Sequence, residues 1–430
     1  MHDALYYLGL LIAGLVAAQL LTFWIGMVLR EWRGAAAYQH ERRLWQARLE
    51  SLRPVTSNQP LRRAWEGWRT FRVARLERLT PDTVSVYLAP EDGRELPPYL
   101  PGQYITVSAN MPGETRPVVR CYSLSRAWQR DCYRCTVKEV APPVDRPDLP
   151  FGKVSRHFNR RLQAGDLLEL KAPGGNFFLS EQSPRPVVLL GAGIGVTPLL
   201  SMMYAVAAGS ASRRVIALFQ FCSGENHPFQ EELKTLRARH KNLRAVIAYS
   251  APRAVDQSPR DYDFHGRLST EIVRKLLPKD DYEFYLCGPG GFMESLVTGL
   301  EAAGVPARDI HYEAFGPASV PRPKAKPPIP AETSAEQSER KSLSAEPLTV
   351  GFSLTSATAN WDGKFASLLE LAEANAIPLE SGCRAGNCGA CAVALQSGKV
   401  IYSQPIGAEL PAGHCLPCIC IPAGPIVLQA

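Results

Sequence analysis

At 430 residues the chain is too long for one ordinary hydrophobic core, so two to four domains are expected. Its net charge of +7 is concentrated between Arg30 and Arg72, where ten arginines stand against four glutamates, which favours an anionic membrane surface over nucleic acid as a partner. Eleven cysteines, an odd number, argue against a secreted disulfide framework and favour a reducing location on the cytoplasmic side of a membrane.

Residues 1–30 are predicted to form a transmembrane anchor. The run 4–29 contains no charged side chain and, as a helix, extends ~39 Å, which exceeds a hydrocarbon core of ~30 Å. A cleaved signal peptide is the alternative, but no basic segment precedes the run and it lacks a convincing cleavage site. Because Arg30 and Arg33 open a basic stretch, the positive-inside rule predicts a single-pass protein with its catalytic domains on the cytoplasmic side. Residues 31–68 are predicted to be a basic juxtamembrane helical segment, either lying on membrane lipid or solvated.

Residues 69–182 are predicted to form an antiparallel β-barrel. Short alternating runs such as 84–88 and 104–107 are separated by proline and glycine turns, which is the pattern of such barrels. Cys132 and Cys135 lie in a strand-like run of this region. Because strand alternation would place the two thiols on opposite faces, and no second pair stands nearby, we do not expect a metal site there.

Two short motifs in this region carry groups suited to a nucleotide cofactor. Residues 120–123 (Arg-Cys-Tyr-Ser) supply a guanidinium for a phosphate, a flat ring for stacking and a hydroxyl for a ring nitrogen. Residues 152–155 (Gly-Lys-Val-Ser) supply a glycine and serine loop whose amides can meet a pyrophosphate. Each motif is weak alone, but their order within one barrel makes them informative.

Residues 183–316 are predicted to be an α/β nucleotide-binding domain. A buried-strand candidate at 187–190 leads into the glycine-rich loop 191–198 and then into a helix from Leu199. Strand, glycine turn and helix can form a phosphate site, because glycine lets a ligand approach backbone amides at the positive end of a helix. The loop reads Gly-x-Gly-x-Gly-x-x-Pro, which differs from the Gly-x-Gly-x-x-Gly dinucleotide fingerprint. Another strand is expected at 215–221.

Residues 317–347 are predicted to be a linker, and residues 348–430 a separate α+β domain. The linker holds seven prolines and no aromatic residue, so it cannot bury a core and is expected to act as a tether. In the last domain we expect a hairpin, a helix at 365–374, and strands at 392–395 and 426–428. This order resembles the β-grasp fold of ferredoxins.

Three cysteines in a Cys-x4-Cys-x2-Cys loop, with a fourth after a long gap, have the spacing that plant-type ferredoxins use to hold a [2Fe-2S] cluster. Glycines between them let the backbone turn closely and direct amides at the sulfurs. The family pattern Leu-x-Cys selects Cys418 as the fourth ligand; Cys415 is the alternative, and Cys420 is expected to be a buried small residue. The predicted metal ligands are Cys383, Cys388, Cys391 and Cys418.

Taken in order, these motifs resemble the ferredoxin–NAD(P)H reductase superfamily, whose flavin domain carries Arg-x-Tyr-Ser and a later Gly-x-x-Ser. The resemblance covers about residues 70–430 and includes a Cys-Gly-Pro at 287–289 and a Glu-Ala-Phe-Gly at 313–316. The flavin ligands that it implies are Arg120, Tyr122, Ser123, Gly152, Lys153, Val154, Ser155, Glu313 and Phe315. The nicotinamide dinucleotide ligands that it implies are Gly191, Gly193, Gly195, Thr197, Cys287, Gly288 and Pro289. The residues that it implies at the point of hydride transfer are Tyr122, Ser123, Cys287 and Phe315.

The resemblance implies FAD as the flavin or, in the branch of phthalate dioxygenase reductase, FMN, and we favour FAD. For the nucleotide, Cys222 stands where many relatives have an arginine, and Glu225 would repel a 2′-phosphate. NADH is therefore expected in preference to NADPH.

Together these parts imply a multidomain reductase that passes electrons from NADH through a flavin to a [2Fe-2S] cluster and on to a protein partner. A flavin is needed because nicotinamide transfers electrons in pairs and the cluster transfers them singly. In the superfamily the partner is a terminal oxygenase, hydroxylase or desaturase, and an anchor suggests a membrane-embedded one. Two alternatives stay open: a respiratory NADH:quinone reductase, and a redox sensor or scaffold with little turnover.

Overall fold

The computed structural model describes residues 65–114, 117–142, 146–180, 183–208, 213–313, 315, 348–382, 384, 386, 389–403, 406, 408 and 410–430. The predicted anchor, most of the predicted basic segment and the predicted linker lie outside these residues. Over the described residues, no helix combines the length and apolar character needed to cross a bilayer. The expected basic helix does not extend over residues 65–68, where the chain has no helix and the Trp65 indole donates to Leu170 O at 3.3 Å.

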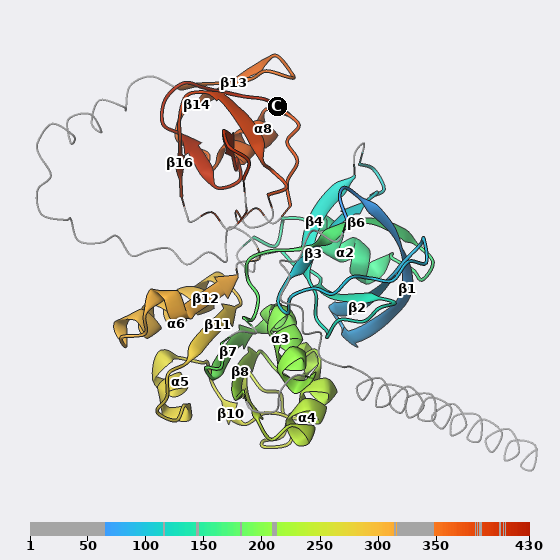
Figure 1. The fold of residues 1–430 in the computed structure, drawn as a ribbon, viewed down its shortest axis with the longest axis vertical. Coiled ribbons are helices and arrows are strands. Elements are labelled where there is room, and N and C mark those ends of the chain that lie inside the picture. The colour runs from blue at the N-terminus through green and yellow to red at the C-terminus, as the bar shows by residue number, and fades with distance from the viewer. Residues whose placement is uncertain are drawn as a thin grey trace, which may run out of the picture. The chain divides into compact units, whose positions relative to one another are not determined.

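The first domain is a six-stranded antiparallel barrel with the spatial order β4-β3-β6-β1-β2-β5 (Figure 1). Its strands are β1 (Arg69–Thr80), β2 (Thr83–Pro90), β3 (Tyr104–Ala109), β4 (Val118–Ser123), β5 (Tyr133–Lys138) and β6 (Leu167–Gly174). A bridge between Leu124 and Cys135 joins the two outer strands and closes the sheet. The expected alternation is clear in β1, where Phe71 and Val73 are fully buried and Arg72 between them is exposed.

Helix α2 (Lys153–Arg160) packs its apolar side into the barrel core. Val154 is 3% exposed and Phe158 is 1% exposed, and burying a side chain of this kind contributes roughly 1.5–3 kcal/mol. Phe158 also contacts the Tyr122 ring of β4, with ring centroids 5.2 Å apart. The packing of α2 therefore brings the two short motifs of the barrel next to each other.

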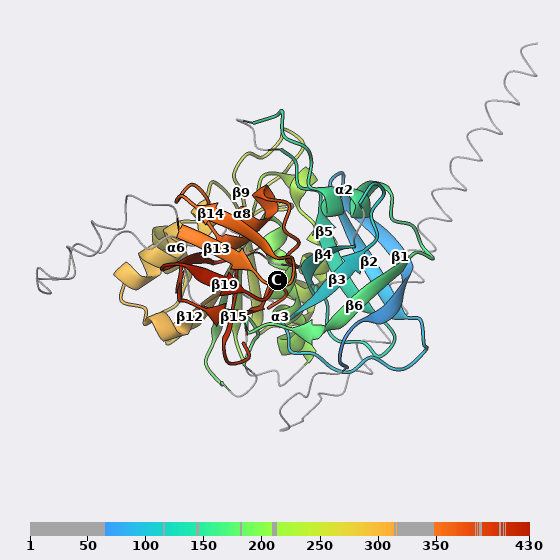
Figure 2. The ribbon, with the colours of Figure 1, turned by 90° about the horizontal axis from the view of Figure 1, so that it is seen from above.

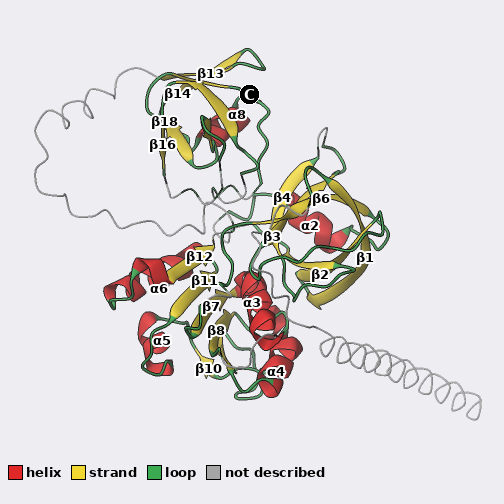
Figure 3. Cartoon of the chain, in the orientation of Figure 1, coloured by secondary structure: helices red, strands yellow, loops and turns green. Residues whose placement is uncertain are grey.

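The second domain is a parallel six-stranded sheet with the order β10-β9-β8-β7-β11-β12. Its elements are β7 (Val187–Ala192), α3 (Val196–Ala208), β8 (Val215–Phe221), α4 (Gln230–Arg239), β9 (Leu243–Tyr249), β10 (Phe264–His265), α5 (Thr270–Leu276), β11 (Glu283–Cys287), α6 (Gly290–Ala302) and β12 (Ile310–Glu313). Figure 3 shows α3 and α4 on one side of the sheet and α5 and α6 on the other. Because helices cover both faces, β7 is an unbroken apolar run with all six residues buried.

The glycine loop differs from its prediction at one point. The helix begins at Val196, three residues before the predicted Leu199, because Gly193–Gly195 form a 3-10 turn that leads directly into it. The strand predicted at 215–221 is present over the same residues as β8. The sheet and the loop that carries the glycines are therefore as expected, with a shorter connection between them.

The C-terminal domain contains a five-stranded mixed sheet with the order β14-β13-β19-β15-β17 and a separate β16-β18 pair. Figure 2 shows β14, β13, β19 and β15 of this sheet. Its elements are β13 (Leu348–Phe352), β14 (Ala357–Trp361), α8 (Leu368–Ala374), β15 (Val393–Ser397), β16 (Val400–Tyr402), β17 (His414–Cys415), β18 (Cys420–Pro422) and β19 (Ile426–Leu428). Helix α8 starts later than the predicted residue 365, because the Ser367 hydroxyl caps it by accepting from Glu370 N at 3.3 Å. Leu368 and Leu371 are fully buried in the core of this domain.

A buried ion pair joins the barrel to the parallel-sheet domain. Arg134 of β5 is 3% exposed, and its Nη1 donates to Glu232 Oε1 of α4 at 2.5 Å. The same guanidinium donates through Nε to Ser125 Oγ at 3.1 Å. A second link is the Ser201 hydroxyl of α3, which donates to Arg126 O at 3.1 Å. Polar groups of the two domains therefore pair with each other at positions that are largely buried, with the Arg134 side chain 3% and the Glu232 side chain 20% exposed.

Replacing Glu232 with alanine should leave the Arg134 guanidinium buried without its carboxylate, at a cost of about 3–5 kcal/mol. The neighbouring Glu231→Ala removes an exposed carboxylate, with 68% of its side chain accessible, from its pair with Lys234 and should cost under about 1 kcal/mol. Urea unfolding of the full chain, followed by tryptophan fluorescence, measures both. Equal midpoints for the two variants would contradict a structural role for the buried pair.

Candidate functional site

Three strand ends meet where the order of the parallel sheet reverses. The chain leaves β7 toward β8 and returns to the other side of β7 through β11. In the sheet register, Gly191 of β7 pairs with Cys287 of β11, and Cys287 pairs with Glu313 of β12. At such a switch point the carboxyl ends of the strands open a crevice that binds ligands in α/β proteins. Predicted cofactor residues from three separate stretches of sequence therefore lie along one sheet edge.

The loop after β7 lies directly against the end of β11. A Cβ atom at Gly195 would be 2.2 Å from Cys287 O and 2.8 Å from Gly288 N, so only glycine allows this contact. Thr197 is 2% exposed, and its hydroxyl donates to Ile194 O at 2.9 Å, which holds the turn. The glycine loop and the Cys-Gly-Pro segment thus form one continuous backbone surface on which a flat ligand can lie.

A hydrogen bond from the barrel reaches this surface. The Ser123 hydroxyl donates to Glu313 Oε2 at 3.3 Å, and both residues are about 95% buried. Cys287 is fully buried, and burial, with a smaller effect of the Glu313 charge, raises the pKa of its thiol well above the ordinary value. Cys287 therefore stays a neutral thiol at physiological pH and is not an activated nucleophile. The resulting site combines one hydroxyl, one carboxylate and one uncharged sulfur.

The barrel side of the site presents Arg120 and Tyr122 on the same face of β4. The guanidinium of Arg120 donates to Val119 O at 2.7 Å, and burial lowers its pKa. Within the described residues, Arg120 forms no ion pair. Burial also raises the pKa of the Tyr122 phenol, which stays protonated. A partly buried guanidinium without a carboxylate partner fits an external phosphate.

Helix α2 begins without a side-chain cap, because its N-cap residue is Gly152. The amides of its first turn are therefore left without helical acceptors. Ser155 Oγ accepts from Val140 N at 3.0 Å and donates to Gly152 O at 3.0 Å, which holds the preceding loop on the helix. Lys153 forms a surface ion pair with Glu114 at 2.5 Å. Open amides at the positive end of a helix fit a pyrophosphate.

The remaining predicted cofactor residues lie after β11 and β12. Pro289 is the N-cap residue of α6, so Gly288 and Pro289 connect the strand end to that helix. Phe315 is 42% exposed and follows β12. The structure thus brings Ser123, Cys287 and Glu313 together and leaves a large part of Phe315 accessible to solvent.

Two of the four predicted cluster ligands are described, and their sulfurs meet. Cys391 Sγ and Cys418 Sγ lie 3.2 Å apart within a buried apolar cluster. Two thiolates on one tetrahedral metal ion with ~2.3 Å bonds are separated by about 3.8 Å, so this pair fits one iron after a small outward shift. Cys383 and Cys388 lie outside the described residues. Over the residues that are described, no group of three metal-binding side chains is found.

The alternative ligand Cys415 has a different environment. Cys415 and Cys420 are hydrogen bonded to each other and lie in the main core of the domain, 1% and 0% exposed. Cys391 and Cys418 belong to a separate cluster. This division favours Cys418 over Cys415 as the fourth ligand.

Gly386 packs directly against Ile419, the residue that follows Cys418. Gly386 has a φ of +73°, and a Cβ there would lie 2.4 Å from Ile419 Cδ1. The amide of Ala408 donates to Gly386 O at 3.0 Å from the other side. A glycine between the first two cysteines is therefore needed both for the backbone conformation and for the close packing.

Strand alternation, the reason given above for expecting no metal site at Cys132 and Cys135, does not hold in the structure. Cys132 precedes β5, so strand alternation does not apply to it; its Sγ donates to Gln129 Oε1 at 3.4 Å. Cys135 is inside the barrel, where burial raises the pKa of its thiol to about 12. Cys135 is therefore a core residue whose thiol stays protonated and is not suited to bind a metal.

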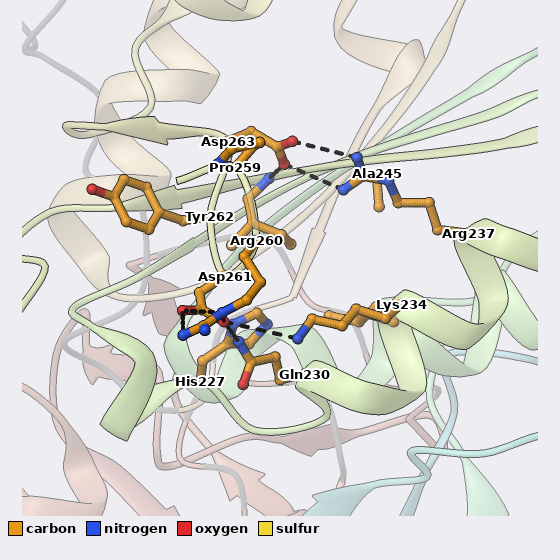
Figure 4. Close-up of a pocket in the computed structure, with 12 residues that line it drawn as sticks. His227, Gln230, Lys234, Arg237, Ala245, Pro259, Arg260, Asp261, Tyr262 and Asp263 are labelled. Carbon is orange, nitrogen blue, oxygen red and sulfur yellow. Dashed lines mark hydrogen bonds and ion pairs between the residues drawn. The ribbon is translucent and has the colours of Figure 1, made fainter. Parts of the chain in front are cut away.

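A small recess beside α4 is shown in Figure 4. Its volume of about 30 Å³ suffices for water and not for a dinucleotide. Arg260 and Lys234 both reach Asp261, at 2.9 and 3.9 Å. His227 shares a hydrogen bond of 2.8 Å with Tyr249, and burial lowers the pKa of the imidazole to about 3. His227 is therefore neutral at physiological pH, and the side chains around the recess serve to hold the local structure together.

One charged residue at the sheet edge escaped the sequence analysis. Arg253, in the loop after β9, forms ion pairs with Glu225 at 3.0 Å and with Asp256 at 3.3 Å. The sequence did contain one indication of this site, since Arg253 follows a strand of the parallel sheet. The contact between Arg253 and Glu225 depends on how the loops after β8 and β9 fold, and no local sequence pattern predicts that.

Profiles of three protein families match the chain. An oxidoreductase FAD-binding domain matches residues 70–179, an oxidoreductase NAD-binding domain matches residues 189–298, and a 2Fe-2S iron-sulfur cluster binding domain matches residues 358–423. The protein is a member of the ferredoxin–NAD(P)H reductase superfamily with a C-terminal 2Fe-2S domain. The matched domains are those of an NAD(P)H-dependent oxidoreductase, with FAD, NAD(H) and a [2Fe-2S] cluster as cofactors.

Individual relatives match parts of this reductase. A flavohemoprotein of Bacillus cereus is 36% identical over 255 residues, which are 59% of this chain and 62% of the relative, so the chain spans about three fifths of that protein. The flavohem-like FAD/NAD-binding domain of nitric oxide dioxygenase from Vibrio cholerae is 35% identical, with a TM-score of 0.51, and the match covers 58% of this chain and 99% of that one. Phthalate dioxygenase reductase, at 23% identity and a TM-score of 0.52, shares the fold over 85% of this chain and 98% of its own.

Replacing Gly195 with alanine should push the glycine loop away from Cys287 and slow the reduction of the flavin by NADH about 100-fold, because errors of ~1 Å in reacting geometry have effects of this size. Stopped-flow absorbance of the flavin measures the rate. Gly291→Ala is the matched control, since no atom lies within 4 Å of a Cβ at that position. Equal rates for both variants at equal flavin content would show that the contact is not needed.

Replacing Cys418 with serine should remove or strongly alter the visible absorption and electron paramagnetic resonance of the [2Fe-2S] cluster, because a cluster iron loses a thiolate. Cys415→Ser changes a core thiol and should keep both signatures. Iron and acid-labile sulfide per protein molecule provide the quantitative measure. An intact cluster in Cys418→Ser together with a lost one in Cys415→Ser would reverse the ligand assignment.

Proposed function

We propose that this protein is a membrane-anchored, NADH-dependent reductase that delivers electrons to a terminal oxygenase, hydroxylase or desaturase. The contact between Ser123 of the FAD-binding barrel and Glu313 of the NAD-binding sheet, beside Cys287, carries the proposal. It supports a hydride transfer site formed jointly by both domains. The neighbouring sulfurs of Cys391 and Cys418 support a cluster as the exit for electrons.

FAD, when bound, takes electrons from nicotinamide as a pair and releases them singly to the cluster. We assign the chain's own residues the task of positioning and enclosing the reacting rings. Gly195 and Gly288 allow the loop after β7 to pack closely against the end of β11 and the start of α6. Glu313 orients the Ser123 hydroxyl, and the buried Cys287 thiol adds an uncharged wall that keeps water away. No nucleophile or acid of the protein is required.

The flavin is proposed to lie along β4 and the start of α2. Arg120 would bind a phosphate, Tyr122 would pack on the flavin ring, and the open first-turn amides of residues 153–155 would bind the pyrophosphate. The contact between Tyr122 and Phe158 supports this assignment, since it holds the two segments together. Because a pyrophosphate occurs in FAD and not in FMN, the helix start also fits FAD.

The class of acceptor is proposed from the order of the domains. The solved phthalate dioxygenase reductase, described as a modular structure for electron transfer from pyridine nucleotides to [2Fe-2S], shares the fold over 85% of this chain. An oxygenase component is the acceptor that such an order serves. The uncharged run 4–29 supports an anchor that would hold the reductase near a membrane-embedded partner or at membrane lipid.

Anaerobic addition of NADH to the purified protein should bleach the flavin absorbance and then give the paramagnetic signal of a reduced [2Fe-2S] cluster. The protein should also reduce cytochrome c, a one-electron acceptor, with NADH as the donor. Cys418→Ser should keep ferricyanide reduction from the flavin and lose most cytochrome c reduction. Failure of NADH to bleach a fully loaded flavin would refute the proposal.

The acceptor is tested by supplying candidates directly. Turnover of an oxygenase, hydroxylase or desaturase recovered with the reductase from native membranes, driven by NADH, is the expected outcome. Rapid quinone reduction by the purified protein alone would favour a respiratory reductase instead. Removing residues 1–30 should release the protein from carbonate-washed membranes and leave NADH–ferricyanide activity unchanged.

A further inference from the structure

Two loops meet beyond the carboxyl end of β8, on the sheet edge that also carries Cys287. The amide of Ser250 donates to Phe221 O at 3.0 Å, and the amide of Ala251 donates to Cys222 O at 2.8 Å, so the loop after β9 is held on the loop after β8. In dinucleotide-binding sheets, side chains after the second strand meet the ribose that carries adenine. With the nicotinamide at Cys287, the adenosine end of the nucleotide is expected at these two loops.

Arg253 lies between two carboxylates at this position. Its Nη1 donates to Glu225 Oε2 at 3.0 Å, and its Nη2 donates to Asp256 Oδ1 at 3.3 Å. Asp256 is fixed in addition by the amides of Gly224 and Arg253, at 3.1 and 2.8 Å, and its side chain is 5% exposed. The Arg253 and Glu225 side chains are 44% and 49% exposed. Asp256 therefore holds the loop and one side of the guanidinium in place, whereas the Arg253–Glu225 pair is accessible to a ligand.

We propose that Glu225 makes the reductase selective for NADH by occupying the guanidinium of Arg253, which in the absence of that carboxylate would bind the 2′-phosphate of NADPH. This inference rests on the proposed use of NADH. Arginine is the side chain best suited to a phosphate, because its planar fork forms paired, charge-assisted hydrogen bonds. The sequence contains that side chain at the adenosine end, but a carboxylate already engages it.

The charges explain the direction of the preference. Arg253, Glu225 and Asp256 together carry a net charge of −1, so a 2′-phosphate meets an anionic site and has to displace Glu225 from its partner. NADH brings a neutral 2′-hydroxyl, which can donate to the Glu225 carboxylate. One side chain therefore acts against NADPH and in favour of NADH.

Glu225→Gln tests the proposal, since it removes the charge and keeps the shape. The affinity for 2′,5′-ADP, measured by calorimetry on the loaded full chain without turnover, should increase about tenfold, and the affinity for 5′-AMP should change less than about threefold. The ratio of kcat/KM for NADPH to that for NADH should rise by a similar factor. The double variant Glu225→Gln/Arg253→Gln should lose both gains, because the phosphate ligand is then absent.

Glu271→Gln is the matched control, because Glu271 is an exposed carboxylate of α5 paired with Lys275 at 2.6 Å, and its loss should change neither ratio. An unchanged affinity of Glu225→Gln for 2′,5′-ADP would overturn the proposal, as would a gain that survives the loss of Arg253. Failure of NADH to reduce the flavin of the unmodified protein would instead refute the proposed function. The two failures are separable, since nucleotide binding is measured without electron transfer.

Discussion

The contact between the backbone at Gly195 and the backbone at Cys287 is the constraint on which the nucleotide site depends. With no side chain at Gly195, the loop after β7 and the end of β11 form one surface, and the sheet register fixes Glu313 beside Cys287. The hydrogen bond from Ser123 then ties the FAD-binding barrel to that surface. A displacement at the glycine would therefore move groups from both domains that must meet the same two rings.

Burial decides how the charged pairs of this reductase behave. In the pair Arg134–Glu232 between two domains, the arginine side chain is 3% exposed and depends on its carboxylate partner, so the pair stabilises the contact of the domains. The pair Arg253–Glu225 is about half exposed, so its partners can exchange for a ligand at little cost. The same two types of side chain thus serve as a structural link in one place and as a selective surface in the other.

The 2Fe-2S domain sorts its described cysteines by environment. Cys391 and Cys418 are in contact within a small separate cluster, while Cys415 and Cys420 pair in the main core. Spacing within the sequence left Cys415 and Cys418 as competing ligands, because only two residues separate them and either could be placed near the loop. The fold separates them, because their segment leaves β17 and turns before β18.

The sequence by itself determined the order of the domains, the main strands and the identity of the cofactor motifs, because alternation, glycine turns and cysteine spacing are local properties of the chain. The strand at 215–221 and the hairpin, helix and final strand of the last domain were predictable in this way. Only the tertiary structure decided that Ser123 meets Glu313, that Arg134 is paired across a domain contact and that Arg253 faces Glu225. These pairs join side chains that are 190, 98 and 28 residues apart, so they depend on how strands and loops pack and leave no periodic trace in the sequence.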